Sequence, residues 1–305
     1  MNYGTLKNGR NIQNSIKFSK KFVHIPVLLQ QVIENLKIKK EGKYIDATAG
    51  LGGHIKEILK TGCKVLAIEI DKQQFENLKK YASSFSNNQN LTLINRNYTE
   101  IKDICKKNAF YPVDGILFDL GISFDQLDKS KKGFSFKNKN DFLDMRMSES
   151  YEICAADIVN SLNENELYEI FARNSEEINS RTIAENIVKS RNMKKIQTVG
   201  NLVEIIDRSV NHHDEYVLSR IFQALRIHVN HELLNLKKAL YSSLEILKNN
   251  GRLLIISFHS IEDRVVKNFI KNNIGKVSQI ALIKSYSPRK FERSAKLRVI
   301  EKNIL

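Results

Sequence analysis

Up to residue 120, short runs of apolar residues alternate with segments in which apolar residues recur at helical spacing. The runs are rich in β-branched residues, which is typical of buried strands. Alternation of this kind predicts a parallel sheet with helices on both faces. The first four strands are expected at residues 43–48, 65–69, 91–95 and 113–120.

The pattern changes after residue 120. Residues 128–140 are polar, and only helical periodicity is found between 155 and 210. One long helix is expected over 215–247, because apolar residues continue along one face. We expect the triplet Asn249-Asn250-Gly251 to turn this helix into the fifth strand. The last three strands are expected at residues 252–258, 280–285 and 296–301.

These patterns predict an α/β protein with an all-helical insertion between its fourth and fifth strands. The sheet domain is expected at residues 23–127 and 213–305, and the insertion, assigned to substrate recognition, at 128–212. Residues 1–22 are basic and contain no acidic residue, so they are expected to form a disordered arm. An organellar presequence would look similar, and we keep it as the alternative to a cytoplasmic protein.

The net charge of +15 is unevenly distributed. Residues 1–127 carry 19 basic and 12 acidic side chains, and residues 213–305 carry 17 and 8. The insertion is close to neutral, with 13 and 14. A basic surface confined to one domain favours a nucleic-acid partner. Ordinary lysine decoration in an AT-rich genome remains the alternative.

The chain lacks the features of a membrane or disulfide-rich protein. No apolar run approaches the roughly 18 residues that a membrane span needs, so no membrane partner is expected. The three cysteines are scattered and form no C-x-x-C pair, which favours a reducing compartment and argues against a zinc site.

A glycine-rich turn follows the first predicted strand. The strand ends in Asp46, and Gly50, Gly52 and Gly53 follow. Ile55 stands where the third glycine of a G-x-G-x-x-G fingerprint would be. The Asp-x3-Gly-x-Gly spacing suits S-adenosylmethionine, which has no pyrophosphate to bind at the helix start, but alone it does not exclude a dehydrogenase.

Polar residues stand at the carboxyl ends of the other strands, where open α/β sheets bind ligands. Glu69 can accept hydrogen bonds from both hydroxyls of a ribose, and Tyr98 can stack on an adenine. Each could instead be structural: Glu69 as a solvated strand-end acid, Tyr98 as a packing residue. Asp119 ends an apolar strand beside Gly121, where its burial must be compensated. A carboxylate at this place can bind an amino group that is to be methylated, with no metal and no covalent nucleophile.

Taken together, many segments resemble the bacterial 16S ribosomal RNA cytosine-N4 methyltransferase family, over about residues 23–302. The segments are HIPVLL (24–29), YIDATAGLGGH (44–54), DGILFDLGIS (114–123), QLD (126–128), KKGFSF (131–136), LDMRM (143–147), FQALRIHVN (222–230), GRLLIISFHSIEDRVVK (251–267) and RSAKLR (293–298).

The resemblance implies a Rossmann-like class I methyltransferase sheet, S-adenosylmethionine as methyl donor, and a cytidine of the small ribosomal subunit as target. Asp119 would orient the amine and also border the donor. The implied donor site comprises Gly52, Gly53, His54, Glu69, Tyr98, Asp119 and Gln126. The residues expected to form the nucleotide pocket or to contact RNA are Asp144, Arg146, Arg226, Asn230, Ser257, His259, Arg293 and Arg298.

Some expectations remain open. Arg226 and Asn230, one turn apart on the expected long helix, could instead form a structural bridge. The family usually has Ser-Pro where Phe124-Asp125 stand, which leaves the presentation of Gln126 uncertain, and Asp where Glu69 stands. The alternatives to the implied function are a DNA amino-methyltransferase and a non-catalytic RNA-binding assembly factor. The sequence does not decide between a monomer and a homodimer.

Overall fold

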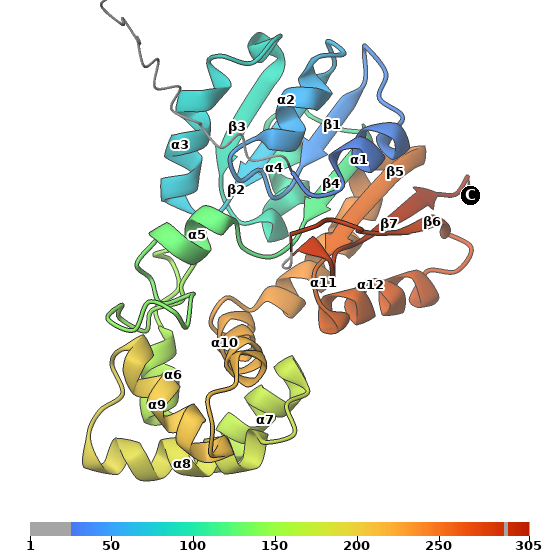
Figure 1. Ribbon diagram of the computed structural model, residues 1–305. Helices are drawn as coiled ribbons and strands as arrows, with labels where there is room; N and C mark the ends of the chain where they lie inside the picture. Colours follow the sequence, from blue (N-terminus) through green and yellow to red (C-terminus); the bar gives the residue numbers. More distant parts are fainter. Residues whose placement is uncertain (1–25, 290–291, 305) are drawn as a thin grey trace, which may run out of the picture.

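The computed structural model describes residues 26–289 and 292–304, so the expected basic arm at 1–22 lies outside the described part of the chain. A sheet domain and a helical insertion lie one above the other in Figure 1. No helix within the described ranges is long and apolar enough to cross a membrane.

The sheet has seven strands in the order β3-β2-β1-β4-β5-β7-β6. The first five strands are parallel, and β7 pairs antiparallel with both β5 and β6. This arrangement confirms the α/β fold expected from the sequence. The strands are β1 (Lys43–Asp46), β2 (Lys64–Glu69), β3 (Leu91–Asn95), β4 (Val113–Asp119), β5 (Leu247–Ser257), β6 (Val277–Lys284) and β7 (Lys296–Lys302).

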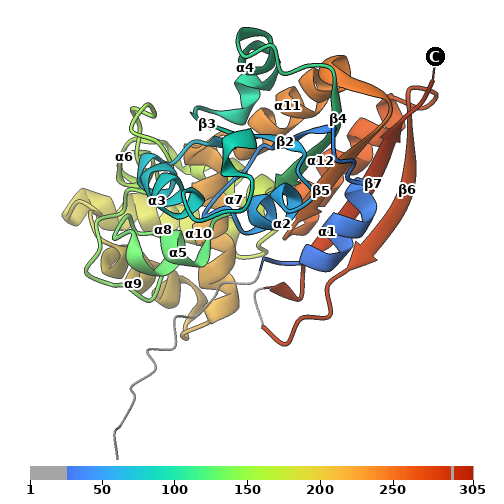
Figure 2. The ribbon, with the colours of Figure 1, turned by 90° about the horizontal axis from the view of Figure 1, so that it is seen from above.

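Helices cover both faces of the sheet, as Figure 2 shows from above. Successive strand residues point to opposite faces, so Tyr44 packs in one core and Ile45 in the other. Helices α1 (Leu29–Leu36), α2 (Gly53–Leu59) and α3 (Lys72–Ala82) cover the first face. The second face is covered by α4 (Ile101–Lys107), α11 (Glu232–Ile246) and α12 (Ser260–Asn272).

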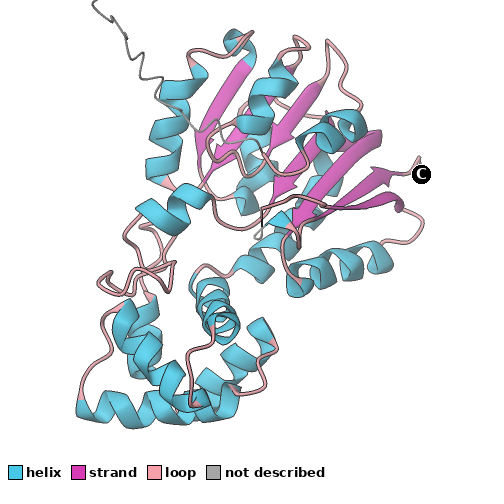
Figure 3. Ribbon diagram, in the orientation of Figure 1, coloured by secondary structure: helices cyan, strands magenta, loops and turns pink. Residues whose placement is uncertain are grey.

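The chain between β4 and β5 leaves the sheet and forms a helical body, which Figure 3 draws without strands. Its apolar core runs from Phe134 to Val229, past the expected boundary at residue 212. We therefore assign α10 to the insertion. The helices of this region are α5 (Phe124–Lys129), α6 (Ala155–Ser161), α7 (Glu164–Ser175), α8 (Ser180–Met193), α9 (Val199–Val210) and α10 (Glu215–Val229).

The single helix expected over 215–247 is wrong, because the structure has two helices there. Helix α10 ends at Val229, Asn230 caps it, and His231 takes the left-handed conformation with φ 51° before α11 begins. The apolar pattern continues across this break, since α10 faces the insertion core and α11 faces the sheet.

The turn expected at 249–251 is also placed differently. Helix α11 ends at Ile246 and β5 starts at once, so the triplet lies inside the strand. The pairing of β4 with β5 shifts register between Val113 and Gly115, and Asn250 has a φ of 59°. The triplet therefore forms an irregularity in the strand and not a turn before it.

Candidate active site

Three neighbouring parallel strands end in carboxylates. Asp46, Glu69 and Asp119 stand at the carboxyl ends of β1, β2 and β4. The backbone that follows β1 is tied to both neighbouring strands, because Ala47 N donates to Leu117 O and Ala49 N to Ile68 O. The glycine-rich turn is thereby fixed at the edge of the sheet where the three acids meet.

The backbone of the turn restricts what can replace its glycines. Gly50 and Gly52 have φ angles of 51° and 81°, in the left-handed region that glycine tolerates best. A Cβ on Gly52 would also lie 2.6 Å from Leu78 Cδ1, and one on Gly53 would lie 2.3 Å from Pro26 Cγ. Above Gly50 a Cβ would meet no atom within 4 Å, so this part of the turn is open to a ligand.

Glu69 faces the turn. Its Oε2 accepts a hydrogen bond from Gly50 N and its Oε1 one from Asp71 N, both at 2.8 Å. Burial raises the pKa of Glu69 to about 7, although these two N–H groups act in the opposite direction. The carboxyl group is thus held at the turn, and its remaining lone pairs can accept ribose hydroxyls.

Gln126 reaches the same place from α5. Ser123 and Gln126 form a capping box at the start of that helix. Gln126 Nε2 donates to Asp71 Oδ2 at 3.0 Å, and Asp71 in turn caps α3 by accepting from Gln73 N and Gln74 N. Although Phe124-Asp125 replace the usual Ser-Pro of the family, Gln126 still lies beside Asp71, two residues after Glu69.

Asp119 is the most perturbed of the three acids. Its N–H donates to Thr48 Oγ1 at 2.6 Å, and its Oδ2 lies 3.7 Å from Nδ1 of the buried His54. Among the described residues its Oδ1 is buried without a hydrogen-bond partner. Burial and the charges of Asp46, Glu262 and Glu292 raise its pKa well above the usual range.

Asp46 shares this environment, since burial raises its pKa to about 7. The pKa values of its neighbours Glu69 and Asp119 are raised too, partly by the charge of Asp46, so it is unfavourable for all three carboxyls to be ionised together. A cationic ligand would relieve this repulsion. The sulfonium of S-adenosylmethionine is such a cation, and the three carboxyls fit that donor.

Tyr98 starts the 3-10 turn Tyr98–Glu100 after β3. Its ring packs edge-on against Phe118, with centroids 5.6 Å apart, so it also serves the core. The preceding Asn97 donates to the hydroxyl of Tyr151, which also accepts from Asn235 Nδ2 and donates to Asn230 O. Tyr151 thus connects the segment after β3 to the junction between α10 and α11.

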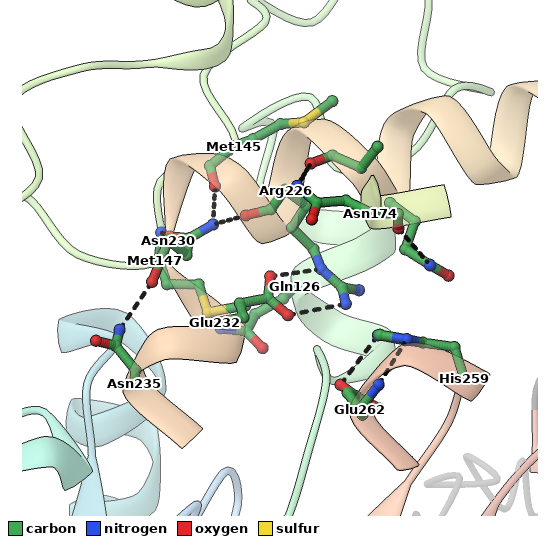
Figure 4. Close-up of polar contacts among 12 residues, drawn as sticks. Gln126, Met145, Met147, Asn174, Arg226, Asn230, Glu232, Asn235, His259 and Glu262 are labelled. Carbon is green, nitrogen blue, oxygen red and sulfur yellow. Dashed lines mark hydrogen bonds and ion pairs between the residues drawn. The ribbon is translucent and has the colours of Figure 1, made fainter. Parts of the chain in front are cut away.

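Arg226 and Asn230 belong to that junction (Figure 4). Arg226 donates to both carboxylate oxygens of Glu232, at 2.8 and 3.0 Å, so this ion pair spans the helix break. Asn230 is 2% exposed; its side chain accepts from Met147 N and donates to Met145 O. In this structure both side chains are held by contacts within the protein, as the alternative of a structural bridge expects.

The other residues expected to contact the target nucleotide lie on two segments: one before α6, and one at the end of β5 and the start of α12. Asp144 and Arg146 pair with each other on the segment before α6, with 2.6 Å between Oδ1 and Nε, and are partly exposed. Ser257 is buried at the end of β5. His259 accepts from Glu262 N, and its Nε2 lies 3.2 Å from Glu262 Oε1.

The two C-terminal arginines differ. Arg293 is exposed, and its Nη2 donates to Pro288 O. Arg298 is 6% exposed, because β7 directs it inward, where its Nε and Nη2 donate to Asp263 and its Nη1 to Gln279. Arg298 therefore takes part in an internal ion pair with Asp263 in this structure.

The sequence did not point to four residues that support the site or the α10–α11 junction. In the sequence, Asp71 stands out only as an acidic residue two positions after Glu69. No pattern around Tyr151 marks it as a functional residue. Glu262 lies three residues after His259, at the spacing of a helix-capping pair. Burial would raise its pKa, but its contacts with His259, the nearby Arg226 and the hydrogen bond from Phe258 N together lower it. The fourth residue, Glu232, was invisible because the helix break was not expected.

Comparison with known proteins identifies the family. A profile of the MraW methylase family matches residues 21–303. The chain belongs to this family. Proteins named ribosomal RNA small subunit methyltransferase H are similar over most of their length. That of Coprothermobacter proteolyticus is 39% identical over 290 residues, covering 92% of this chain and 96% of the relative. That of Cytophaga hutchinsonii is 42% identical over 251 residues, covering 81% and 82%.

Solved structures resemble the chain more distantly. A structure described as a putative rRNA methylase from Clostridium thermocellum has a TM-score of 0.47 and 14% identity, covering 92% of this chain and all of that one. As a member of the MraW methylase family with a class I methyltransferase sheet, the protein is an enzyme that uses S-adenosylmethionine. No three His, Cys, Asp or Glu side chains are grouped as metal ligands in the described part of this chain.

Proposed function

We propose that this MraW-family enzyme transfers a methyl group from S-adenosylmethionine to the exocyclic N4 of a cytidine in 16S ribosomal RNA. The observation that carries the proposal is Asp119, a strand-end carboxyl with a free acceptor oxygen beside the donor turn. The names of the relatives support a small-subunit ribosomal RNA as substrate. The basic ends of the chain support the same class of partner.

S-adenosylmethionine supplies an electrophilic methyl group on a positively charged sulfur. Gly50, Glu69 and Gln126 would hold the donor at the ends of β1 and β2, with the glycine turn open above Gly50. The carboxyls of Asp46 and Asp119 stabilise positive charge at this place. Their contribution is greatest when both are ionised.

Asp119 would bind the amino group of the target base through Oδ1. The lone pair of a cytosine N4 is delocalised into the ring, so a hydrogen bond that favours a pyramidal nitrogen assists attack. Methylation makes this nitrogen positive, and one N–H proton must leave. Asp119 can accept that proton, because its raised pKa makes its carboxylate a stronger base than an ordinary aspartate.

The target base must leave its stack to reach this buried edge of the sheet, so the enzyme flips it or binds a site where it is already unpaired. We propose the small ribosomal subunit as the partner that presents it and the cytoplasm as the compartment.

The proposal is tested with Asp119→Asn, which keeps the shape of the side chain and removes its charge and basicity. We expect methyl transfer to unmodified small subunits to fall by about 10²–10⁴-fold. Mass spectrometry of digested ribosomal RNA should show N4-methylcytidine with the wild type and almost none with the variant. A different methylated nucleoside, or an equally active variant, would overturn the assignment of Asp119 and the cytidine.

A further inference from the structure

A pocket of about 280 Å³ opens beside the carboxyl end of β5, on the side away from the glycine turn. Phe258 lines it and also lies close to the loop after Asp119, since a Cβ on Gly121 would lie 3.5 Å from the Phe258 ring. Strand β5 is the direct neighbour of β4, with Ile256 opposite Asp119. The pocket is lined by Phe258, His259, Ser260, Lys284, Ser285, Tyr286, Arg293, Ser294, Ala295 and Lys296.

The lysines and the arginine that line this pocket have no acidic residue beside them in the lining. Lys284 and Arg293 are exposed, and neither is paired with a carboxylate in the part of the chain that the structure describes. Lys296 is partly exposed, with Nζ 3.5 Å from Asp263 Oδ2. Three cations around one small pocket favour an anion such as a phosphate.

Tyr286 stands at the rim of the pocket and is 92% exposed. Because Tyr286 lines the same pocket as Lys284 and Arg293, a planar base could stack on its ring while these cations hold a phosphate. Single-stranded nucleic acid is bound in this way, with bases stacked on aromatic rings and the backbone on a basic groove.

Hydrogen bonds hold the residues on either side of Tyr286. Ser285 N donates to Ala295 O at 2.9 Å. Glu292, which is 5% exposed, accepts from Ser287 Oγ and from Arg289 Nη1. The residues on either side of Tyr286 are thus hydrogen-bonded to Glu292 and Ala295.

We infer that this flanking-nucleotide pocket binds the RNA nucleotide adjacent to the target cytidine, with its phosphate at Lys284, Arg293 and Lys296 and its base on Tyr286. The inference rests on the proposed RNA substrate and extends it. Neighbouring strands lie about 4.8 Å apart, so the start of β7 is about two strand spacings from the end of β4. A chain with its target base at Asp119 would pass directly over Phe258 into the pocket.

The experiment compares Tyr286→Ala, Tyr286→Phe and Arg293→Gln with the wild type, using unmodified small subunits. We expect Tyr286→Ala to weaken binding by roughly 5- to 150-fold, the range of one stacked base, and Tyr286→Phe to retain it. Arg293→Gln should reduce the slope of log affinity against log salt by about 0.7. Tyr81→Ala and Lys79→Gln, on α3, are the matched controls.

Methyl-donor affinity, measured by calorimetric titration, should be unchanged in all of these variants. A second readout places 4-thiouridine next to the target cytidine and maps the photo-cross-link to a peptide that contains Tyr286. If the wild type methylates the cytidine but the variants bind like the controls and no such cross-link forms, the pocket inference is overturned and the proposed function stands. A wild type that leaves the cytidine unmethylated would instead contradict the function itself.

Discussion

Single residues at the strand ends show how the site is tuned to charge. Burial raises the pKa of Asp46 from 3.8 and that of Glu69 from 4.5, each to about 7. When the pH lies between the unfolded and the folded pKa values, the native protein binds more protons than the unfolded chain. The two carboxyls therefore lower the free energy of unfolding progressively as the pH rises from about 4 to 7.

A bound cation favours the ionised carboxyls, so S-adenosylmethionine should bind more tightly as the pH rises from 6 to 8 and should release protons on binding. Titration calorimetry in buffers of different ionisation enthalpy measures this release. S-adenosylhomocysteine, whose sulfur is neutral, is the control and should release fewer protons. Equal proton release by both ligands would show that these carboxyls do not respond to the sulfonium.

Glu69→Gln should weaken donor binding by about 1.5–3 kcal/mol, because a charge-assisted hydrogen bond to the ribose is lost. Glutamine keeps an acceptor for Gly50 N or Asp71 N, so the turn should persist. Glu57→Gln, on the exposed side of α2, is the control. An unchanged dissociation constant would remove Glu69 from the donor site.

Glu69 and Asp119 could be predicted as ligand-binding residues because each ends an apolar strand, and that pattern is local. The contact between Gln126 and Asp71 could not, since the two residues are 55 positions apart and meet only after α5 has docked. Arg298 shows the same limit. Its charge is visible in the sequence, but its inward direction depends on the pairing of β7.

Among the elements, the α10–α11 junction shows what periodicity cannot reveal. The sequence fits one continuous helix, yet the buried faces of the two segments belong to different cores. The break is fixed by long-range contacts to the segment before α6 and not by a local helix breaker such as proline or glycine. The strands carry their own signal, and for this reason the sheet could be predicted and the junction could not.

Asn230→Ala should loosen this junction. It leaves Met147 N and Met145 O without partners, which should lower the free energy of unfolding by about 2–4 kcal/mol. Thermal unfolding should accordingly shift downward by roughly 3–6 °C for a chain of this length. Asn88→Ala removes an exposed side-chain contact and serves as the control. Unfolding temperatures equal to the wild type would show that Asn230 does not hold the junction.

For the whole molecule, the basic surface predicts the form of the substrate. Residues 213–305 carry nine more basic than acidic groups, and they include the flanking-nucleotide pocket. Binding that depends on phosphates weakens steeply with salt, and folded ribosomal RNA offers more of them than a short strand. We expect methylation of assembled or partly assembled small subunits, and little of an oligonucleotide containing the same cytidine.

Tritiated methyl transfer to small subunits, naked 16S ribosomal RNA and the oligonucleotide at matched concentration measures this preference. Repeating the comparison over a series of salt concentrations separates phosphate contacts from contacts to the base. Equal rates on all three substrates would mean that the enzyme reads only local sequence, and the basic surface would then have another role.

The position of the insertion also bears on how the protein is made. Strand β4 ends at Asp119, whereas its partner β5 begins only at Leu247. During synthesis the chain emerges from its amino end, so β4 waits with one edge unpaired while the insertion is translated. The insertion has its own contiguous core, ending at Val229, and can fold during that interval. Strand β5, which lies beside Asp119, is thus added after the insertion. A nascent chain truncated before β5 would carry a folded insertion next to an incomplete active site.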